Sequence, residues 1–284
     1  MSATLAPTAR STEPAELSEP RAPRRTVARV YYGALSLLCL FSIVLSTSIA
    51  VAGPTASLIP NPETASSLAV IVQELSYFTI LSNILVMIVS FLLMRDPGRT
   101  GRVFSVVHFD AMIMITVTGL VYAIVLAPLW HPTGLSLVSN AGLHYLAPPL
   151  FILGFALFGP RPRFSFKILG QALIIPIAWL IYTLIHGAII GWYPYPFIDV
   201  NALGYGQVAI NVVAIVIGSL AIGAIYLAIG SLVGRVSDKH RGQQLGKSQP
   251  SDGYTVPDTI EGIDLRDETS TTDDQRQVAG STGR

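Results

Sequence analysis

All 18 lysines and arginines of this chain lie in four segments, and long apolar runs separate those segments. There are six apolar runs, each close to or above the roughly 20 residues that an α-helix needs to cross a bilayer. They are Val30–Ala52, Leu68–Met94, Val103–Ala127, Ala141–Phe158, Ile168–Ile190 and Val208–Val233. Only 12% of the residues are charged, well below the share in a soluble domain. We therefore predict an all-α, polytopic membrane protein with six transmembrane helices.

Along the chain, segments that contain lysine or arginine alternate with segments that contain neither. The basic segments are 1–29, 95–102, 159–167 and 234–284, and the segments without lysine or arginine are 53–67, 128–140 and 191–207. Basic loops stay on the cytoplasmic side of a membrane, so the pattern predicts a cell-membrane protein with both termini cytoplasmic. A signal peptide ending at Ala50-Val51-Ala52 is the competing interpretation, but the apolar run before it exceeds the usual length of about 7–15 residues.

The ends of the chain differ in composition from the six-helix transmembrane domain that we predict for residues 30–233. Residues 1–29 and 234–284 are rich in polar residues and have almost no apolar pattern. Such segments cannot bury enough apolar surface to fold alone, so we expect disordered cytoplasmic tails. The single cysteine, Cys39, excludes an internal disulfide. We expect no cofactor or metal and no nucleic-acid partner, and membrane lipids as the surroundings.

Polar residues within the runs gather toward the non-cytoplasmic side. They are Glu74, Thr79 and Asn83 on the second run, His144 on the fourth with Asn140 one turn earlier, Tyr182 and His186 on the fifth, and Asn211 on the sixth. An ideal helical rise places Thr79 about 16 Å below the outer boundary and His144 near that boundary. Buried polar groups usually face a bundle interior or a cavity, so we predict an outward-opening polar pocket. Interhelical hydrogen bonding is the alternative, and we favour it for Ser76, Ser82 and Thr118.

Two further segments have simpler interpretations. The aromatic and proline-rich segment Gly191–Phe197 is typical of a membrane-interface anchor, and it also suits a semi-rigid cap over a pocket. His108 and Asp110 begin the third run near the cytoplasm, where we expect a satisfied boundary pair.

Three segments together resemble a known family. Tyr77–Asn83, Asn140–His144, and Tyr182 with the Gly191–Phe197 loop are similar to the androgen-induced and androgen-dependent six-span membrane proteins, most closely to their bacterial branch. The resemblance covers roughly residues 30–233. Characterised animal members are threonine hydrolases that cleave fatty acid esters of hydroxy fatty acids.

The resemblance implies a threonine-type carboxylic ester hydrolase acting on a lipid ester. Thr79 would be the nucleophile and His144 its general base, since a threonine hydroxyl needs an adjacent base. Asn140 would orient the imidazole, and Asn83, Tyr182 or His186 would stabilise the oxyanion.

Two other functions remain open from the sequence. The first is a non-catalytic membrane protein that uses the same pocket to bind or transport a lipid or small molecule. A bis-histidine haem protein is a third interpretation, motivated by His144 and His186 at similar depth, and a Soret band would identify it.

Overall fold

The computed structural model describes residues 21–53, 66–159 and 164–247. The chain divides into two units, Met1–Val236 and Ser237–Arg284, and every contact discussed below lies within the first. Helix extends to Arg21 at one end and Lys247 at the other. The rest of the predicted tails, residues 1–20 and 248–284, lies outside the described residues.

The described secondary structure is helical throughout. In chain order the elements are α1 (Arg21–Ala52), α2 (Ser67–Leu75), α3 (Phe78–Arg95), α4 (Arg102–Val121), the π-helical turn η1 (Tyr122–Leu126), α5 (Gly134–Asn140), the π-helical turn η2 (Ala141–Leu146), α6 (Ala147–Phe158), α7 (Phe166–Ala172), α8 (Ile174–Ile190), the 3-10 turn η3 (Pro196–Ile198) and α9 (Val200–Lys247).

Within the described residues, six helical stretches are long and apolar enough to cross a membrane. They are Arg24–Ala52, Phe78–Arg95, Arg102–Leu126, Gly134–Phe158, Phe166–Ile190 and Val200–Ser231. By length and composition these stretches confirm the prediction of an all-α protein with six spans.

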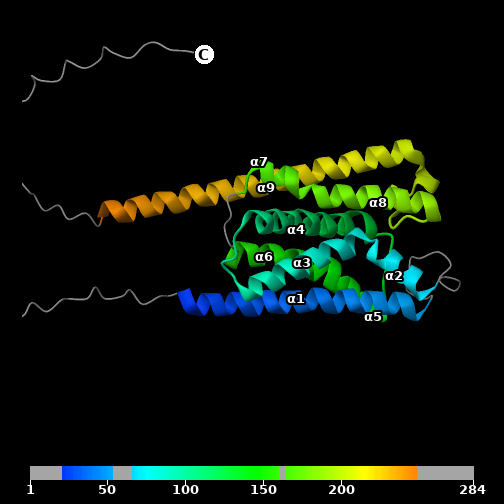
Figure 1. Cartoon of the computed structure of the whole chain (residues 1–284), viewed down its shortest axis with the longest axis horizontal. Helices are drawn as coiled ribbons and strands as arrows, with labels where there is room; N and C mark the ends of the chain where they lie inside the picture. The colour runs from blue at the N-terminus through cyan, green and yellow to red at the C-terminus, as the bar shows by residue number, and fades with distance from the viewer. Residues whose placement is uncertain (1–20, 54–65, 160–163, 248–284) are drawn as a thin grey trace, which may run out of the picture. The chain divides into compact units, whose positions relative to one another are not determined.

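Helices α1, α3, α4 and α6 lie side by side around the main apolar core (Figure 1). Tyr32, Val86, Met112 and Phe151, one from each helix, are fully buried there. Helices α8 and α9 instead leave many apolar side chains exposed, as Ile217 illustrates with 61% of its surface accessible. Such exposure suits helices that face hydrocarbon, because lipid tails are as apolar as the side chains.

The described basic residues gather at one end of the bundle. The guanidinium of Arg24 donates to the Leu157 carbonyl over 2.7 Å and thereby joins the start of α1 to the end of α6. The connection between α3 and α4, which runs from Arg95 to Arg102 and contains Arg99, lies at the same end (Figure 1). Two of the basic segments of the sequence therefore lie at the same end of the bundle.

The second crossing is broken shortly before Thr79. Ser76 ends α2, and Tyr77 adopts an extended conformation (φ −67°, ψ 133°) before α3 begins at Phe78. The chain changes direction at this point (Figure 1). Thr79 is therefore the second residue of α3, where a backbone N–H has no partner within the helix.

The fourth crossing begins earlier than the apolar run predicts, at Gly134 rather than Ala141, and it contains the π-helical turn η2. Pro148 and Pro149 explain the turn, because neither residue has an N–H to continue the α-helical ladder. The N–H of Ala147 bonds to the Gly142 carbonyl, five residues earlier, instead of to Leu143. The predicted proline kink therefore takes the form of a widened turn that presents His144.

Candidate active site

Thr79 and His144 are in direct contact. The Thr79 hydroxyl oxygen lies 3.1 Å from Nε2 of His144. Thr79 comes from the first turn of α3 and His144 from η2. Thr79 is buried, with 7% of its surface exposed, and His144 is half-buried. The pair has the geometry of a hydroxyl that can donate its proton to an imidazole.

The expected depth difference between these residues is absent because the fourth crossing begins earlier than its apolar run. With the start at Gly134, His144 lies ten residues into the crossing, about 15 Å along the helix axis. This depth is close to the roughly 16 Å expected for Thr79.

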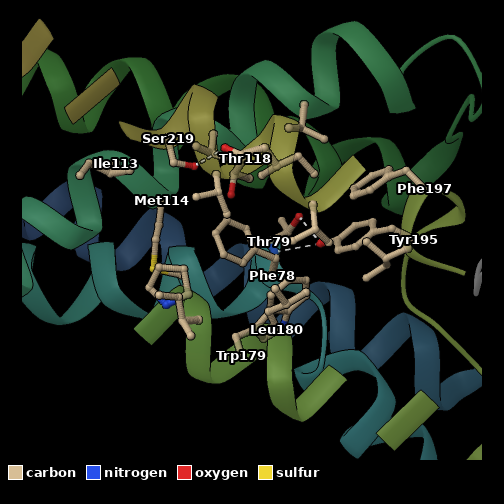
Figure 2. A pocket seen from close by; sticks show the side chains of 18 of the residues that line it. Phe78, Thr79, Ile113, Met114, Thr118, Trp179, Leu180, Tyr195, Phe197 and Ser219 are labelled. Carbon is tan, nitrogen blue, oxygen red and sulfur yellow. Dashed lines mark hydrogen bonds between the residues drawn. The ribbon is translucent and has the colours of Figure 1, made fainter. Parts of the chain in front are cut away.

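Tyr195, from the loop between α8 and α9, completes the contact. Its phenol oxygen accepts a hydrogen bond from the Thr79 N–H over 3.1 Å and lies 3.3 Å from the Thr79 hydroxyl oxygen, as Figure 2 shows. Burial raises the pKa of the Tyr195 phenol to about 12, so it is protonated at neutral pH. One consistent arrangement has Tyr195 donating to the Thr79 hydroxyl and Thr79 donating to His144.

The loop that carries Tyr195 is fixed at several points. Gly191 ends α8 in the left-handed conformation (φ 72°) that glycine readily adopts. The Tyr193 ring occupies the space that a Cβ atom on Gly187 would need. The Asn211 side chain donates to the Phe197 carbonyl over 2.8 Å. The predicted Gly191–Phe197 segment thus packs over the site.

The imidazole of His144 stacks on Tyr122. The ring centroids are 3.9 Å apart and the planes are inclined by 24°. The Asn140 side-chain amide donates to the Tyr122 hydroxyl over 2.7 Å, so Asn140 reaches the imidazole through this ring. Nδ1 of His144 forms no hydrogen bond of normal geometry within the described residues, although the Asn140 backbone interacts with the ring.

Asn83 holds the two site helices together. Its fully buried side-chain amide donates to the Thr79 carbonyl over 2.8 Å and to the Leu143 carbonyl over 3.2 Å. The Leu143 carbonyl needs this donor because η2 directs the Ala147 N–H to Gly142. The amide is therefore committed to backbone carbonyls of both site helices.

Two cavities meet at Thr79. The first, of about 110 Å³, is almost entirely apolar and lies among α3, α4, α8, α9 and the loop before α9, and Figure 2 shows Thr79 and Tyr195 on its wall. The second, of about 190 Å³, is more polar, and His144, Glu74 and Tyr122 line it. Thr79 and Tyr195 line both cavities, so the site borders one space that is almost wholly apolar and a second, called the polar cavity below, that adds polar side chains to an apolar wall.

Glu74 belongs to the polar cavity. One carboxylate oxygen accepts a hydrogen bond from the Ser46 hydroxyl over 2.5 Å. The side chain is 8% exposed. Glu74 therefore contributes a buried acidic group to the same space that contains the Thr79–His144 pair.

The structure does not bring the other predicted site residues to Thr79. Tyr182 bonds instead to the Ser76 hydroxyl over 2.7 Å, and His186 stacks on Tyr182. Neither lines either cavity, and Asn211 supports the loop rather than the cavity wall.

His108 and Asp110 are not the satisfied pair that the sequence suggests. Both are almost completely buried, and both imidazole nitrogens and one carboxylate oxygen have no hydrogen-bond partner in the described part of the chain. The His108 ring instead lies among phenylalanine rings, including Phe151 and Phe155.

Sequence reasoning did not single out Tyr195 or Tyr122 for the site. The sequence assigns Tyr195 only to an aromatic cap. Nothing in the sequence reveals that its phenol lies opposite the unpaired N–H at the start of α3. Tyr122 gives no signal in the sequence, because its stacking on His144 depends on two π-helical turns.

In the described residues, no group of three or more His, Cys, Asp or Glu side chains lies together in a way that could hold a metal ion. In comparisons with known proteins, no family model, no curated protein and no solved structure matches this chain.

Proposed function

We propose that this membrane protein is a threonine-type hydrolase of lipid esters. The observation that carries the proposal is the 3.1 Å contact between the Thr79 hydroxyl and Nε2 of His144 at the junction of two cavities. The resemblance of Tyr77–Asn83 and Asn140–His144 to a family of membrane threonine hydrolases agrees with it.

The proposed reaction has two acyl-transfer steps. The Thr79 oxygen attacks the ester carbonyl carbon while its proton passes to Nε2 of His144. The ester C–O bond then breaks, and the leaving alcohol takes that proton. Water from the polar cavity attacks the acyl-threonine, gives a proton to His144, and releases the fatty acid. The returning proton restores the Thr79 hydroxyl.

Two donors are placed to stabilise the oxyanion. They are the Thr79 N–H and the Tyr195 phenol. The phenol oxygen lies 3.1 Å from the Thr79 nitrogen and 3.3 Å from the nucleophilic Thr79 oxygen. A carbonyl oxygen bound beside Thr79 would accept from both in place of their mutual contact. A nucleophile's own backbone N–H serves this purpose in serine hydrolases.

Replacing Tyr195 by phenylalanine tests this role. We expect the turnover of a lipid ester to fall by roughly 10–1000-fold with an intact fold, because one oxyanion donor is lost. The measurement is the rate of fatty acid release by purified protein in nanodiscs. Tyr193→Phe is the matched control, since Tyr193 lines neither cavity. Equal rates for wild type and Tyr195→Phe would exclude the phenol from the reaction.

We also propose that the protein lies in the cell membrane with both termini in the cytoplasm and the site opening outward. The location of all 18 lysines and arginines supports this orientation. The site lies at the end of the bundle opposite the Arg95–Arg102 connection.

Cysteine labelling tests the orientation, and the only natural cysteine, Cys39, is buried. Thr100 and Thr133 are exposed residues at opposite ends of the bundle. In a Cys39→Ala background, we expect a membrane-impermeant maleimide to label Thr133→Cys on intact cells and Thr100→Cys only after permeabilisation. The reverse pattern would place the site on the cytoplasmic side.

A non-catalytic lipid-binding function is the second candidate, and the apolar cavity favours it on its own. Turnover separates the two functions. Purified wild-type protein in nanodiscs is expected to release fatty acid from an acyl ester catalytically. Folded protein that retains a bound lipid but releases no acid would favour the binding function.

A further inference from the structure

We propose, resting on the proposed hydrolase function, that Glu74 selects esters whose alcohol part donates hydrogen bonds and carries no negative charge next to the ester bond. The acyl chain would occupy the apolar cavity and the alcohol part the polar cavity.

The division of the substrate follows from the composition of the two cavity walls. The apolar cavity is bounded by side chains such as Val117, Leu180 and Ile215, with few polar atoms. The wall of the polar cavity includes Glu74, Ser136 and Ser139 as well as apolar side chains. The site around Thr79 therefore has one side that suits a hydrocarbon chain and one side that suits a polar group of a bound ester.

Within residues 21–53, 66–159 and 164–247, Glu74 forms no ion pair with a lysine or arginine. The segments 53–67, 128–140 and 191–207, which connect the helices at this end, contain no lysine or arginine. The hydrogen bond described for the carboxylate is the one from Ser46. A buried carboxylate without an ion pair requires donors, and a ligand in the cavity is positioned to supply them.

Glu74 also lines the same cavity as Thr79, His144 and Tyr195, so its carboxylate shares an enclosed space with the reacting groups. A second negative charge in this enclosed space would be repelled by the carboxylate and would have no cation to pair with. Hydroxyl or ammonium groups would instead donate to it. The shared chemistry of the preferred alcohols is thus a hydrogen-bond donor without negative charge.

The test compares three esters with the same decanoyl chain: decanoylglycerol, decanoylcholine, and the decanoyl ester of glyceric acid, in which a carboxylate replaces one hydroxymethyl group of glycerol. We expect wild-type protein in nanodiscs to hydrolyse the glycerol ester at least about tenfold faster than the glyceric acid ester. The choline ester carries a positive charge but no N–H or O–H donor, so it separates the effect of charge from that of hydrogen bonding, and we expect it to be hydrolysed more slowly than the glycerol ester.

Glu74→Gln keeps the shape of the side chain and removes its charge. We expect this variant to reduce the ratio of the hydrolysis rates of the glycerol ester and the glyceric acid ester by about tenfold, mainly because the anionic ester is hydrolysed faster. Asp199→Asn is the matched control, because Asp199 lies at the same end of the bundle but lines neither cavity. An equal rate for both esters in wild type, or an unchanged ratio in Glu74→Gln, would overturn the inference alone. If none of the three esters is hydrolysed, both the proposed function and the inference are overturned.

Discussion

Replacing Thr79 by alanine is expected to reduce lipid-ester hydrolysis by at least about a thousandfold, because the variant has no nucleophile for the acyl-transfer step. The Asn83 side chain bonds to the backbone carbonyl of Thr79, which alanine retains, so the helix start and this bond should persist. The measurement is the initial rate of fatty acid release at saturating ester.

Two controls accompany this variant. Thr79→Ser keeps the hydroxyl and should retain activity within about tenfold of wild type. Thr183→Ala removes another buried threonine hydroxyl, one that has no hydrogen-bond partner in the described part of the chain and lines neither cavity, and it should leave the rate unchanged. Full activity in Thr79→Ala would exclude Thr79 as the nucleophile.

Replacing His144 by glutamine should lower the rate by roughly 10²–10⁴-fold, because an amide can accept a hydrogen bond from Thr79 but cannot take its proton. The glutamine also loses the stacking of His144 on Tyr122. The rate should therefore be compared with the thermal stability of the variant in the same detergent.

His186→Gln is the matched control for this change. His186 is a half-buried histidine on α8 that stacks on Tyr182 and lines neither cavity. Its replacement should leave hydrolysis within about twofold of wild type. An equal loss in both histidine variants would indicate a general effect on folding rather than a base at His144.

The crossings were predictable because the bilayer imposes a length and a polarity on every span. The six predicted runs correspond to six helical stretches, and the 2.8 Å hydrogen bond between Ser82 on α3 and Thr118 on α4 gives both residues the interhelical role that we favour for them. Helix boundaries were less predictable. Gly134–Asn140 contains serine and asparagine, and its low hydropathy concealed the first two turns of the fourth crossing.

The Thr79–His144 contact could be anticipated only through the family resemblance, and ideal helices argue against it. Two local breaks make it geometrically feasible: the separation of α2 from α3 at Tyr77, and the widened turn before Pro148. The spacing of apolar residues reveals neither break. Only the second break has a signal in the sequence, the prolines that follow it. Tyr195 could not be placed at all, since a loop residue reaches its partner only through the tertiary packing of Tyr193 and Phe197.

The most direct test of the account is covalent labelling of the purified wild-type protein with a fluorophosphonate hydrolase probe, followed by mass spectrometry of its peptides. We predict a single adduct on the Thr79 hydroxyl, absent from Thr79→Ala and formed much more slowly in His144→Gln. A folded wild-type protein that forms no adduct, or forms it on another residue, would contradict the claim that His144 activates Thr79.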